Sequence, residues 1–228
     1  MYSDKRVSLI IPCYNEERGL DIVLNNKPVF IDELIVIDND SSDRTSEIAR
    51  KYGAKVVHLK EKGYGLACQV GLRHASGEII IIMDADNSYP ILETKEFLAH
   101  MEREQCDFIT GCRFPLIDKH AMPFIKRVSN YFISWLIRKC FHIQLTDSQT
   151  GMFVLKRHLL EAVIPSNCGM GFTQEIKLKA WLNPNIRTAE LHINYQKRIG
   201  KSKYRPIRDG AKTLWGIFIF LSAYYKRQ

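Results

Sequence analysis

Short apolar runs alternate with longer amphipathic stretches along the first 114 residues. The apolar runs have the length and composition of buried strands, and they cover residues 7–12, 33–38, 55–59, 78–83 and 107–110. Helical patterns lie between several of them, over residues 41–52, 66–75 and 93–104. Gly53 and Gly77 stand where the first two of these helices should end. The alternation predicts βαβ units and an α/β fold with an open, mostly parallel sheet flanked by helices.

The composition is that of one globular domain without a membrane span. The chain has 228 residues, of which 46% are hydrophobic and 25% charged, so general disorder is excluded. No window reaches the roughly 18 apolar residues of a spanning helix. The first residues do not resemble a secretory signal, which predicts a cytoplasmic location. Six cysteines contain no CxxC pair, so we expect free thiols and no zinc site.

Charge divides the chain into two unlike halves. The formal net charge is +8, but residues 1–114 contain 14 Lys and Arg against 19 Asp and Glu, which gives −5. Residues 115–228 contain 19 basic and 6 acidic residues, which gives +13. The acidic half is therefore expected to hold a cation, or a ligand bridged by one, and the basic half to meet an anionic partner. A nucleic acid would satisfy the charge, but no recognition motif supports it.

The basic half carries two amphipathic helical patterns. One covers residues 123–141 and places Phe124, Val128, Phe132, Trp135 and Leu136 on one face. The other begins at residue 206 and ends in an aromatic stretch over residues 214–225. Between them we expect strands at 151–155 and 187–195 and a helix at 173–182. The two amphipathic helices fit either packing on the sheet or contact with a membrane surface, and for the last helix we favour the membrane.

Polar residues follow the predicted strands at the edge where parallel strands end. This edge is where open α/β sheets bind ligands. Asp84 and Asp86 follow the most apolar strand and are separated by one residue, so they can share a divalent cation that bridges phosphates. The D-x-D pair alone would also fit a solvated turn. Gly63-Tyr64-Gly65 lacks the third glycine of a dinucleotide fingerprint, which argues against a dehydrogenase.

Several motifs occur together in the order and spacing of a known family. They are IIPCYNEE, IVIDNDSSDRT, KGYGLACQVGL, IIIMDAD and ITGCR, followed by AMPFIKRVSN, LTDSQTGMFVLKR, GFTQEIKLKA and KRIGKSK. Over roughly residues 6–210 the chain resembles the A-type inverting glycosyltransferases. The nearest group is the dolichyl-phosphate mannose synthases and related polyprenyl-phosphate glycosyltransferases. The resemblance implies a Rossmann-like A-type fold with C-terminal amphipathic, interfacial helices.

The same resemblance implies roles for individual residues. Contacts to the nucleotide base and ribose would come from Pro12, Tyr14, Glu16, Ile37, Asp38 and Asn39. The sugar diphosphate would be bound by Asp84, Ala85 and Asp86, with Asp84 and Asp86 as ligands of Mg²⁺ or Mn²⁺. The residues implied to act in catalysis are Asp86, Arg113, Arg198 and Lys203, and the last three would also neutralise the donor diphosphate. The acceptor phosphate would be met by Arg113, Lys126 and Arg127.

Three positions depart from the family pattern. Asn39 stands where the family usually has an Asp that reads the base, which leaves guanine and uracil both open. Ser88 falls where some members supply an amide ligand to the metal. Val154 replaces an Arg often found after the turn at Gly151. These departures motivate an alternative reading, in which the chain is a catalytically inactive homologue that binds nucleotide or lipid as a subunit.

The expected reaction moves a hexose from a GDP- or UDP-linked donor to dolichyl or polyprenyl phosphate with inversion. A phosphomonoester is already an anion at pH 7, so the reaction needs no general base, and no Ser-His-Asp or Cys-His arrangement is expected. Residues 1–205 would form the catalytic domain, with 1–114 as nucleotide-sugar half and 115–205 as acceptor half. Residues 206–228 would form a membrane-apposed helix. The protein would be peripheral on the cytoplasmic face of a membrane, by itself or through a separate anchoring subunit.

Overall fold

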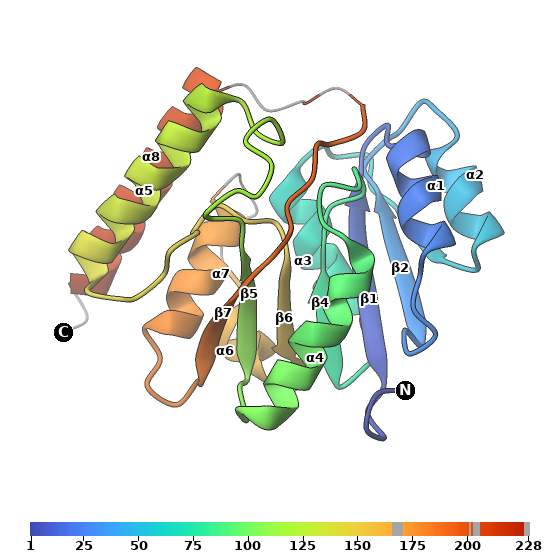
Figure 1. Cartoon of the computed structure of the whole chain (residues 1–228), viewed down its shortest axis with the longest axis horizontal. Coiled ribbons are helices and arrows are strands. Elements are labelled where there is room, and N and C mark those ends of the chain that lie inside the picture. The colour runs from blue at the N-terminus through green and yellow to red at the C-terminus, as the bar shows by residue number, and fades with distance from the viewer. Residues whose placement is uncertain (166–170, 201, 203–205, 226–228) are drawn as a thin grey trace.

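One mixed β-sheet forms the centre of the molecule (Figure 1). The computed structural model describes residues 1–165, 171–200, 202 and 206–225. In this part of the chain seven strands form a sheet in the order β3-β2-β1-β4-β6-β5-β7. Their bounds are β1 (Val7–Cys13), β2 (Glu33–Asp38), β3 (Lys55–His58), β4 (Ile79–Ile82), β5 (Phe108–Cys112), β6 (Phe153–Lys156) and β7 (Thr188–His192).

Every strand pairing in the sheet is parallel except those of β6, which is antiparallel to β4 and to β5. The predicted mostly parallel α/β sheet is thus confirmed. Val154 lies at the middle of β6, opposite Ile81 of β4 and Ile109 of β5, and is fully buried. A chain that reverses at β6 can place the turn before it, residues 146–151, at the same edge as the carboxyl ends of the parallel strands.

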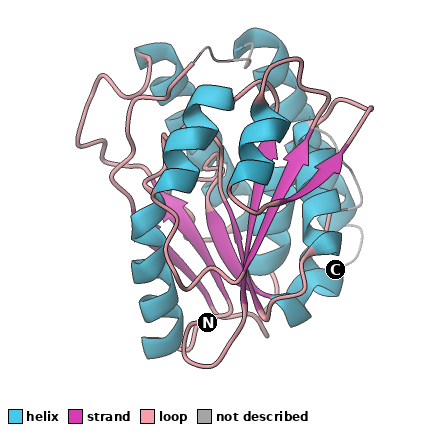
Figure 2. Ribbon diagram, turned by 90° about the vertical axis from the view of Figure 1, so that its right-hand side faces the viewer, coloured by secondary structure: helices cyan, strands magenta, loops and turns pink. Residues whose placement is uncertain are grey.

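Two helical layers cover the sheet, as Figure 2 shows from the side. Successive strand residues face opposite layers. Leu9 of β1 therefore packs with α1 (Glu17–Asn25), α2 (Thr45–Lys51) and α4 (Thr94–Arg103), whereas Ile10 packs with α3 (Tyr64–His74), α6 (Leu160–Val163) and α7 (Phe172–Trp181). Short 3₁₀ turns, η1 (Ile91–Glu93) and η2 (Arg157–Leu159), precede α4 and α6.

A pair of long helices stands beside these layers. Helices α5 (Phe124–Phe141) and α8 (Pro206–Tyr225) run side by side in Figure 1, next to α7. Ile133 and Ile137 of α5 share a buried cluster with Leu178 of α7 and Ile217 of α8. Among the residues described, none of the helices combines the length and the apolar character needed to span a bilayer.

Most predicted elements are present, with shifts at their ends. Helix α2 starts at Thr45, where Asp43 accepts a hydrogen bond from the Thr45 N–H (3.0 Å). Gly53 follows the helix with φ +75°, as a C-terminal cap requires. Helix α3 starts two residues earlier than predicted, at Tyr64. The five cysteines within the described residues are free thiols, as expected.

Candidate active site

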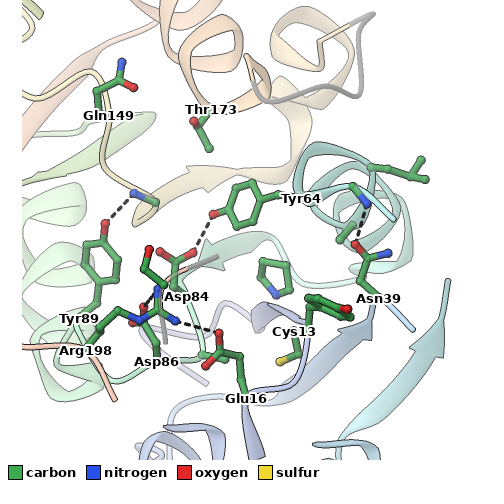
Figure 3. A pocket seen from close by; sticks show the side chains of 18 of the residues that line it. Cys13, Glu16, Asn39, Tyr64, Asp84, Asp86, Tyr89, Gln149, Thr173 and Arg198 are labelled. Atoms are coloured by element: carbon green, nitrogen blue, oxygen red, sulfur yellow. Dashed lines mark hydrogen bonds and ion pairs between the residues drawn. The ribbon is translucent and has the colours of Figure 1, made fainter. Parts of the chain in front are cut away.

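A cavity of about 770 Å³ opens at the carboxyl ends of the parallel strands (Figure 3). The predicted site residues that line it are Pro12, Tyr14, Glu16, Asn39, Asp84, Ala85, Asp86, Arg113, Lys126 and Arg198. They lie at the end of β1, follow β1, β2, β4, β5 or β7, or belong to α5, and therefore come from both halves of the chain. The sheet gathers these residues because consecutive parallel strands end at one edge.

Asp84 is held at the cavity wall by contacts with Tyr64 and Gly151. Its Oδ1 accepts a hydrogen bond from the Tyr64 hydroxyl (2.8 Å). Burial, and the nearby negative charge of Asp86, raise the pKa of Asp84 to about 6. Gly151 packs directly against this carboxylate: a Cβ at that position would lie 2.7 Å from Asp84 Oδ2. Any larger residue at 151 would push the carboxylate out of place.

Asp86 is held by its own loop and by a cation from a distant segment. Its Oδ1 accepts hydrogen bonds from the Ser88 N–H (3.0 Å) and hydroxyl (2.5 Å). Its Oδ2 lies 3.2 Å from Nη1 of Arg198, whose Nη2 donates to Glu16 Oε1 (3.0 Å). Figure 3 shows Arg198 between the two acids. The Ile199 N–H also donates to the Asp86 carbonyl (2.8 Å), which fixes this segment to the D-x-D loop.

Helix α1 sets the position of the D-x-D backbone. A Cβ on Gly19 would lie 2.5 Å from the Ala85 carbonyl oxygen and 2.9 Å from Asp86 Cα. Real Cβ atoms essentially never approach backbone atoms so closely, so only glycine allows this contact. Gly19 is thus a site-forming residue that sequence reasoning missed. A glycine inside the apolar pattern of a helix is the signal that could have indicated it.

Asn39 binds the protein backbone on both sides of its amide. Its Nδ2 donates to the Glu61 carbonyl (2.7 Å), and its Oδ1 accepts from the Gly63 N–H (2.7 Å). The side chain therefore holds the loop between β3 and α3 against the cavity wall. Lys62 of that loop lies over the Tyr14 ring, with Nζ 4.6 Å from the ring centroid.

Two residues predicted beside the base lie away from the cavity. Ile37 is fully buried and packs on the α3 side of β2, because alternate residues of a strand face opposite layers. Asp38 is 3% exposed and accepts hydrogen bonds from the Ser41 N–H (3.0 Å) and the Ser46 hydroxyl. These bonds lower the pKa of Asp38 against the opposing effect of burial. Neither residue is among the described residues that line the cavity, and their contact with a nucleotide base stays a prediction.

Three of the predicted phosphate-binding cations take different positions. Arg113 lines the cavity at 2% exposure and pairs with Asp147, an acid that the sequence analysis did not name. Lys126 of α5 also lines the cavity, and burial, reinforced by the charge of Arg113, lowers its pKa. Arg127 lies over the Phe124 ring, 5.3 Å from its centroid, and is not among the described lining residues. Lys203 lies outside the described residues.

Helices α5 and α8 form a wall of the cavity and also an apolar outer surface. Lys126 and Asn130 of α5 and Lys212 and Thr213 of α8 line the cavity. The same helices expose large apolar side chains to solvent, which are Phe124, Ile125, Val128, Tyr131, Phe132, Trp135, Leu214, Trp215, Phe218 and Ile219. We call these ten residues the apolar face.

The acids at the cavity suit a hard divalent cation shared with a ligand. Among the described residues no group of three or more His, Cys, Asp or Glu side chains could hold a metal alone. Asp84 and Asp86 supply carboxylate oxygens, which Mg²⁺ and Mn²⁺ prefer, and the rest of the coordination would have to come from substrate oxygens and water. The pKa of Asp84 is raised, and Asp86 is already paired with the Arg198 cation. A bound cation would therefore stabilise the ionised form of these two acids.

Solved structures with a similar fold include several of glucosyl-3-phosphoglycerate synthase from Mycobacterium tuberculosis. The complex with Mn²⁺, UDP and phosphoglyceric acid has a TM-score of 0.73 at 20% identity, over 96% of this chain and 79% of that one. The complex with Mg²⁺ and UDP has a TM-score of 0.71, also at 20% identity, over 94% of this chain and 79% of that one. At this identity the likeness shows the A-type glycosyltransferase fold.

Curated relatives and a family model agree with the fold. An uncharacterised glycosyltransferase of Mycobacterium tuberculosis is 32% identical over 198 residues, covering 86% of this chain and 88% of that protein. A dolichyl-phosphate hexose transferase of Haloferax volcanii is 29% identical over 215 residues, covering 92% and 91%. A dolichol-phosphate mannosyltransferase of Pyrococcus furiosus is 30% identical over 186 residues, covering 76% and 53%. The model described as glycosyl transferase family 2 matches residues 8–163, and the chain therefore belongs to this family of glycosyltransferases.

Proposed function

We propose that this glycosyltransferase moves a hexose from a nucleotide diphosphate sugar to dolichyl or polyprenyl phosphate, with inversion at the anomeric carbon. The names of the Haloferax and Pyrococcus relatives support both a hexose and a dolichyl phosphate acceptor. The mycobacterial structures with UDP support a nucleotide-linked donor. The sugar and the base, GDP- or UDP-linked, are left to the experiment below.

The donor diphosphate and its cation belong at Asp84 and Asp86. These carboxylates would hold Mg²⁺ or Mn²⁺, and such an ion, when bound, offsets the charge of the leaving diphosphate. Mn²⁺ and Mg²⁺ in the mycobacterial complexes support this choice. Tyr64 and Gly151 keep Asp84 in position, and Ser88 does so for Asp86. Ser88 thus supports a metal ligand through its hydroxyl.

Cations on the opposite wall suit an anionic acceptor. Arg113 and Lys126 both interact electrostatically with Asp84, and Lys212 of α8 lines the same cavity. A phosphomonoester that reaches these cations needs no general base, because it is ionised at neutral pH. The protein has to orient it and exclude water while the cations stabilise charge.

The apolar face is the observation that carries a lipid acceptor. Phe124 and Trp215 are 68% and 64% exposed, and the face spans two adjacent helices whose other residues line the cavity. A water-soluble acceptor such as phosphoglycerate would need the cations but not this face. A lipid phosphate needs both, with its phosphate in the cavity and its chain at the bilayer. The basic charge of residues 115–228 favours an anionic membrane surface.

The test is release of nucleoside diphosphate from radiolabelled GDP- and UDP-sugars, with Mn²⁺ and with different acceptors. We expect sugar transfer to a short-chain polyprenyl phosphate and none to 3-phosphoglycerate. The opposite preference would overturn the lipid acceptor. Nucleotide binding without any turnover would favour the catalytically inactive homologue.

A second arm tests the apolar face with vesicles that contain anionic lipid. Trp135→Glu combined with Phe218→Glu should reduce vesicle binding about tenfold or more, with turnover on a soluble short-chain acceptor preserved. Val29→Glu, which alters a residue that is 98% exposed elsewhere, is the matched control. Failure of the unmodified protein to bind vesicles, with soluble-acceptor turnover intact, would mean that a separate subunit supplies the membrane contact.

A further inference from the structure

A turn over residues 146–151, buried except at Thr146 and Gln149, joins the two halves of the cavity. Its backbone N–H groups donate to three distant side chains: Glu190 of β7 (2.6 and 2.8 Å), Ser134 of α5 (3.0 Å) and the Tyr89 hydroxyl (2.8 Å). Side chains from three separate parts of the chain thus accept hydrogen bonds from the turn and hold it in place. The turn is therefore a rigid part of the site.

Asp147 of this turn forms a bidentate ion pair with the guanidinium of Arg113. Its Oδ2 accepts from Arg113 Nε (2.6 Å) and backbone N–H (3.1 Å), and its Oδ1 accepts from Nη2 (2.8 Å). Asp147 is 0% exposed, so the pair is shielded from water. A bidentate pair fixes the plane and the direction of a guanidinium. Arg113 itself lines the cavity, so its guanidinium N–H groups that do not bond to Asp147 can serve a ligand there.

Lys177 of α7 binds two backbone carbonyls of the turn. It is fully buried on α7, and its Nζ donates to the carbonyl oxygens of Ser148 (3.0 Å) and Thr150 (2.6 Å). These two carbonyls flank the stretch that leads to Gly151, which rests against the Asp84 carboxylate. A displacement of the turn would therefore move both a cation and an acid of the cavity.

We propose that Asp147 and Lys177 are positioning residues of the transfer reaction. Asp147 acts through Arg113, which it orients toward a phosphate group in the cavity. Lys177 acts through the turn, which keeps Gly151 beside Asp84. Neither residue has to touch substrate for this role. The inference rests on the proposed function to the extent that it assigns Arg113 to a phosphate.

The first test compares two acids that form ion pairs with basic residues next to β5. Asp147→Asn should lower kcat for nucleoside diphosphate release roughly 10²-fold, the scale of losing one preorganised charge, and change the donor KM less than about threefold. Asp107→Asn is the matched control, because it breaks the Asp107–Lys156 pair (2.8 Å) at the opposite end of β5. It should leave kcat unchanged. Lys177→Met should lower kcat by about 10- to 100-fold, the scale of an outer-shell support.

A double-mutant cycle separates positioning from a purely structural role. If Asp147 acts through Arg113, Asp147→Asn should cause little further loss in an Arg113→Gln background. Additive losses would overturn the proposal, as would a folded Asp147→Asn variant with kcat within about threefold of the unmodified protein. Should the single variants fail to fold, the double variant decides, since it removes both charges of the buried Arg113–Asp147 pair. Near-normal kcat in that double variant would contradict the proposal.

The assay also keeps this proposal separate from the acceptor assignment. Release of UDP or GDP is measured with and without polyprenyl phosphate, and hydrolysis of the donor needs no lipid. If the unmodified protein hydrolyses donor but transfers no sugar to lipid phosphate, the acceptor assignment fails. The cycle on hydrolysis then still tests whether Asp147 orients Arg113.

Discussion

The two walls of the cavity are built in different ways. On the wall from residues 1–114, Asp84 and Asp86 stand directly after β4, and backbone register places them at the sheet edge. On the second wall, which residues 115–228 form together with Arg113, the cavity residues lie on long helices or pair with a turn that is held by side chains from other elements. Substitutions on the first wall should therefore affect chemistry more than stability, and those on the second should affect chemistry and stability together.

The largest effect is expected on the first wall, from Asp86→Ala. Its loss removes a metal carboxylate and the acceptor of the Ser88 and Arg198 contacts, so turnover should fall about 10³-fold, with a smaller change in melting temperature than substitutions on the second wall cause. Calorimetry should show weaker Mn²⁺ binding. Asp40→Ala is the control, since Asp40 follows β2 at the same edge and pairs with Lys62 (3.3 Å). Turnover by Asp86→Ala near the normal rate in EDTA would remove the metal assignment.

Arg198 connects the two walls, and Arg198→Gln tests what that contact does. We expect kcat to fall roughly 10²-fold, because a cation that meets developing phosphate charge is lost. Mn²⁺ should bind more tightly, since Arg198 Nη1 lies 3.2 Å from Asp86 Oδ2 and competes for that oxygen. Lys197→Gln, at an exposed neighbour, is the control. Weaker Mn²⁺ binding by the Arg198 variant would mean that the guanidinium supports the metal site.

The sequence predicted the first wall better than the second for a physical reason. An all-apolar strand followed by Asp84-Ala85-Asp86 is a local pattern, and the sheet edge follows from it. Helix α1 was not predicted although Leu20, Val23 and Leu24 have the spacing of a buried helix face, because the helix is only nine residues long and its apolar pattern is correspondingly short. The Arg113–Asp147 pair joins residues 34 positions apart, and no periodicity reports such a contact. The family resemblance indicated Arg113 as a site residue, but its partner Asp147 became evident only from the structure.

A smaller effect is expected from Asn39→Asp. The structure gives this amide two backbone partners, Glu61 and Gly63. A carboxylate there would lose the donor to the Glu61 carbonyl and repel it, so the loop that lines the cavity should loosen. Affinities for UDP and GDP should both fall about tenfold, the worth of roughly 1.4 kcal/mol. A change confined to one nucleotide, measured by calorimetry on the same preparation, would instead mean that residue 39 reads the base.

The smallest effect, and the one most specific to the second wall, concerns Lys177 and pH. Burial lowers the pKa of Lys177 to about 7, and a neutral amine still has two hydrogens for the two carbonyls that accept from it. In the unfolded chain a lysine titrates near 10.4. Between these values the unfolded state binds more protons, so this group makes the free energy of unfolding rise with pH, by up to about 1.4 kcal/mol per unit.

Lys177→Met should remove that rise. Urea unfolding at pH 7, 8 and 9 should show a slope against pH that is about 1 kcal/mol per unit lower than in the unmodified protein. Lys179→Met, on the same helix and partly exposed beside Glu175, is the matched control and should keep the normal slope. Equal slopes in all three proteins would mean that Lys177 keeps its proton when folded. Its ammonium would then be stabilised by Asp147, and the second wall would hold a permanent charge that its fold has to balance.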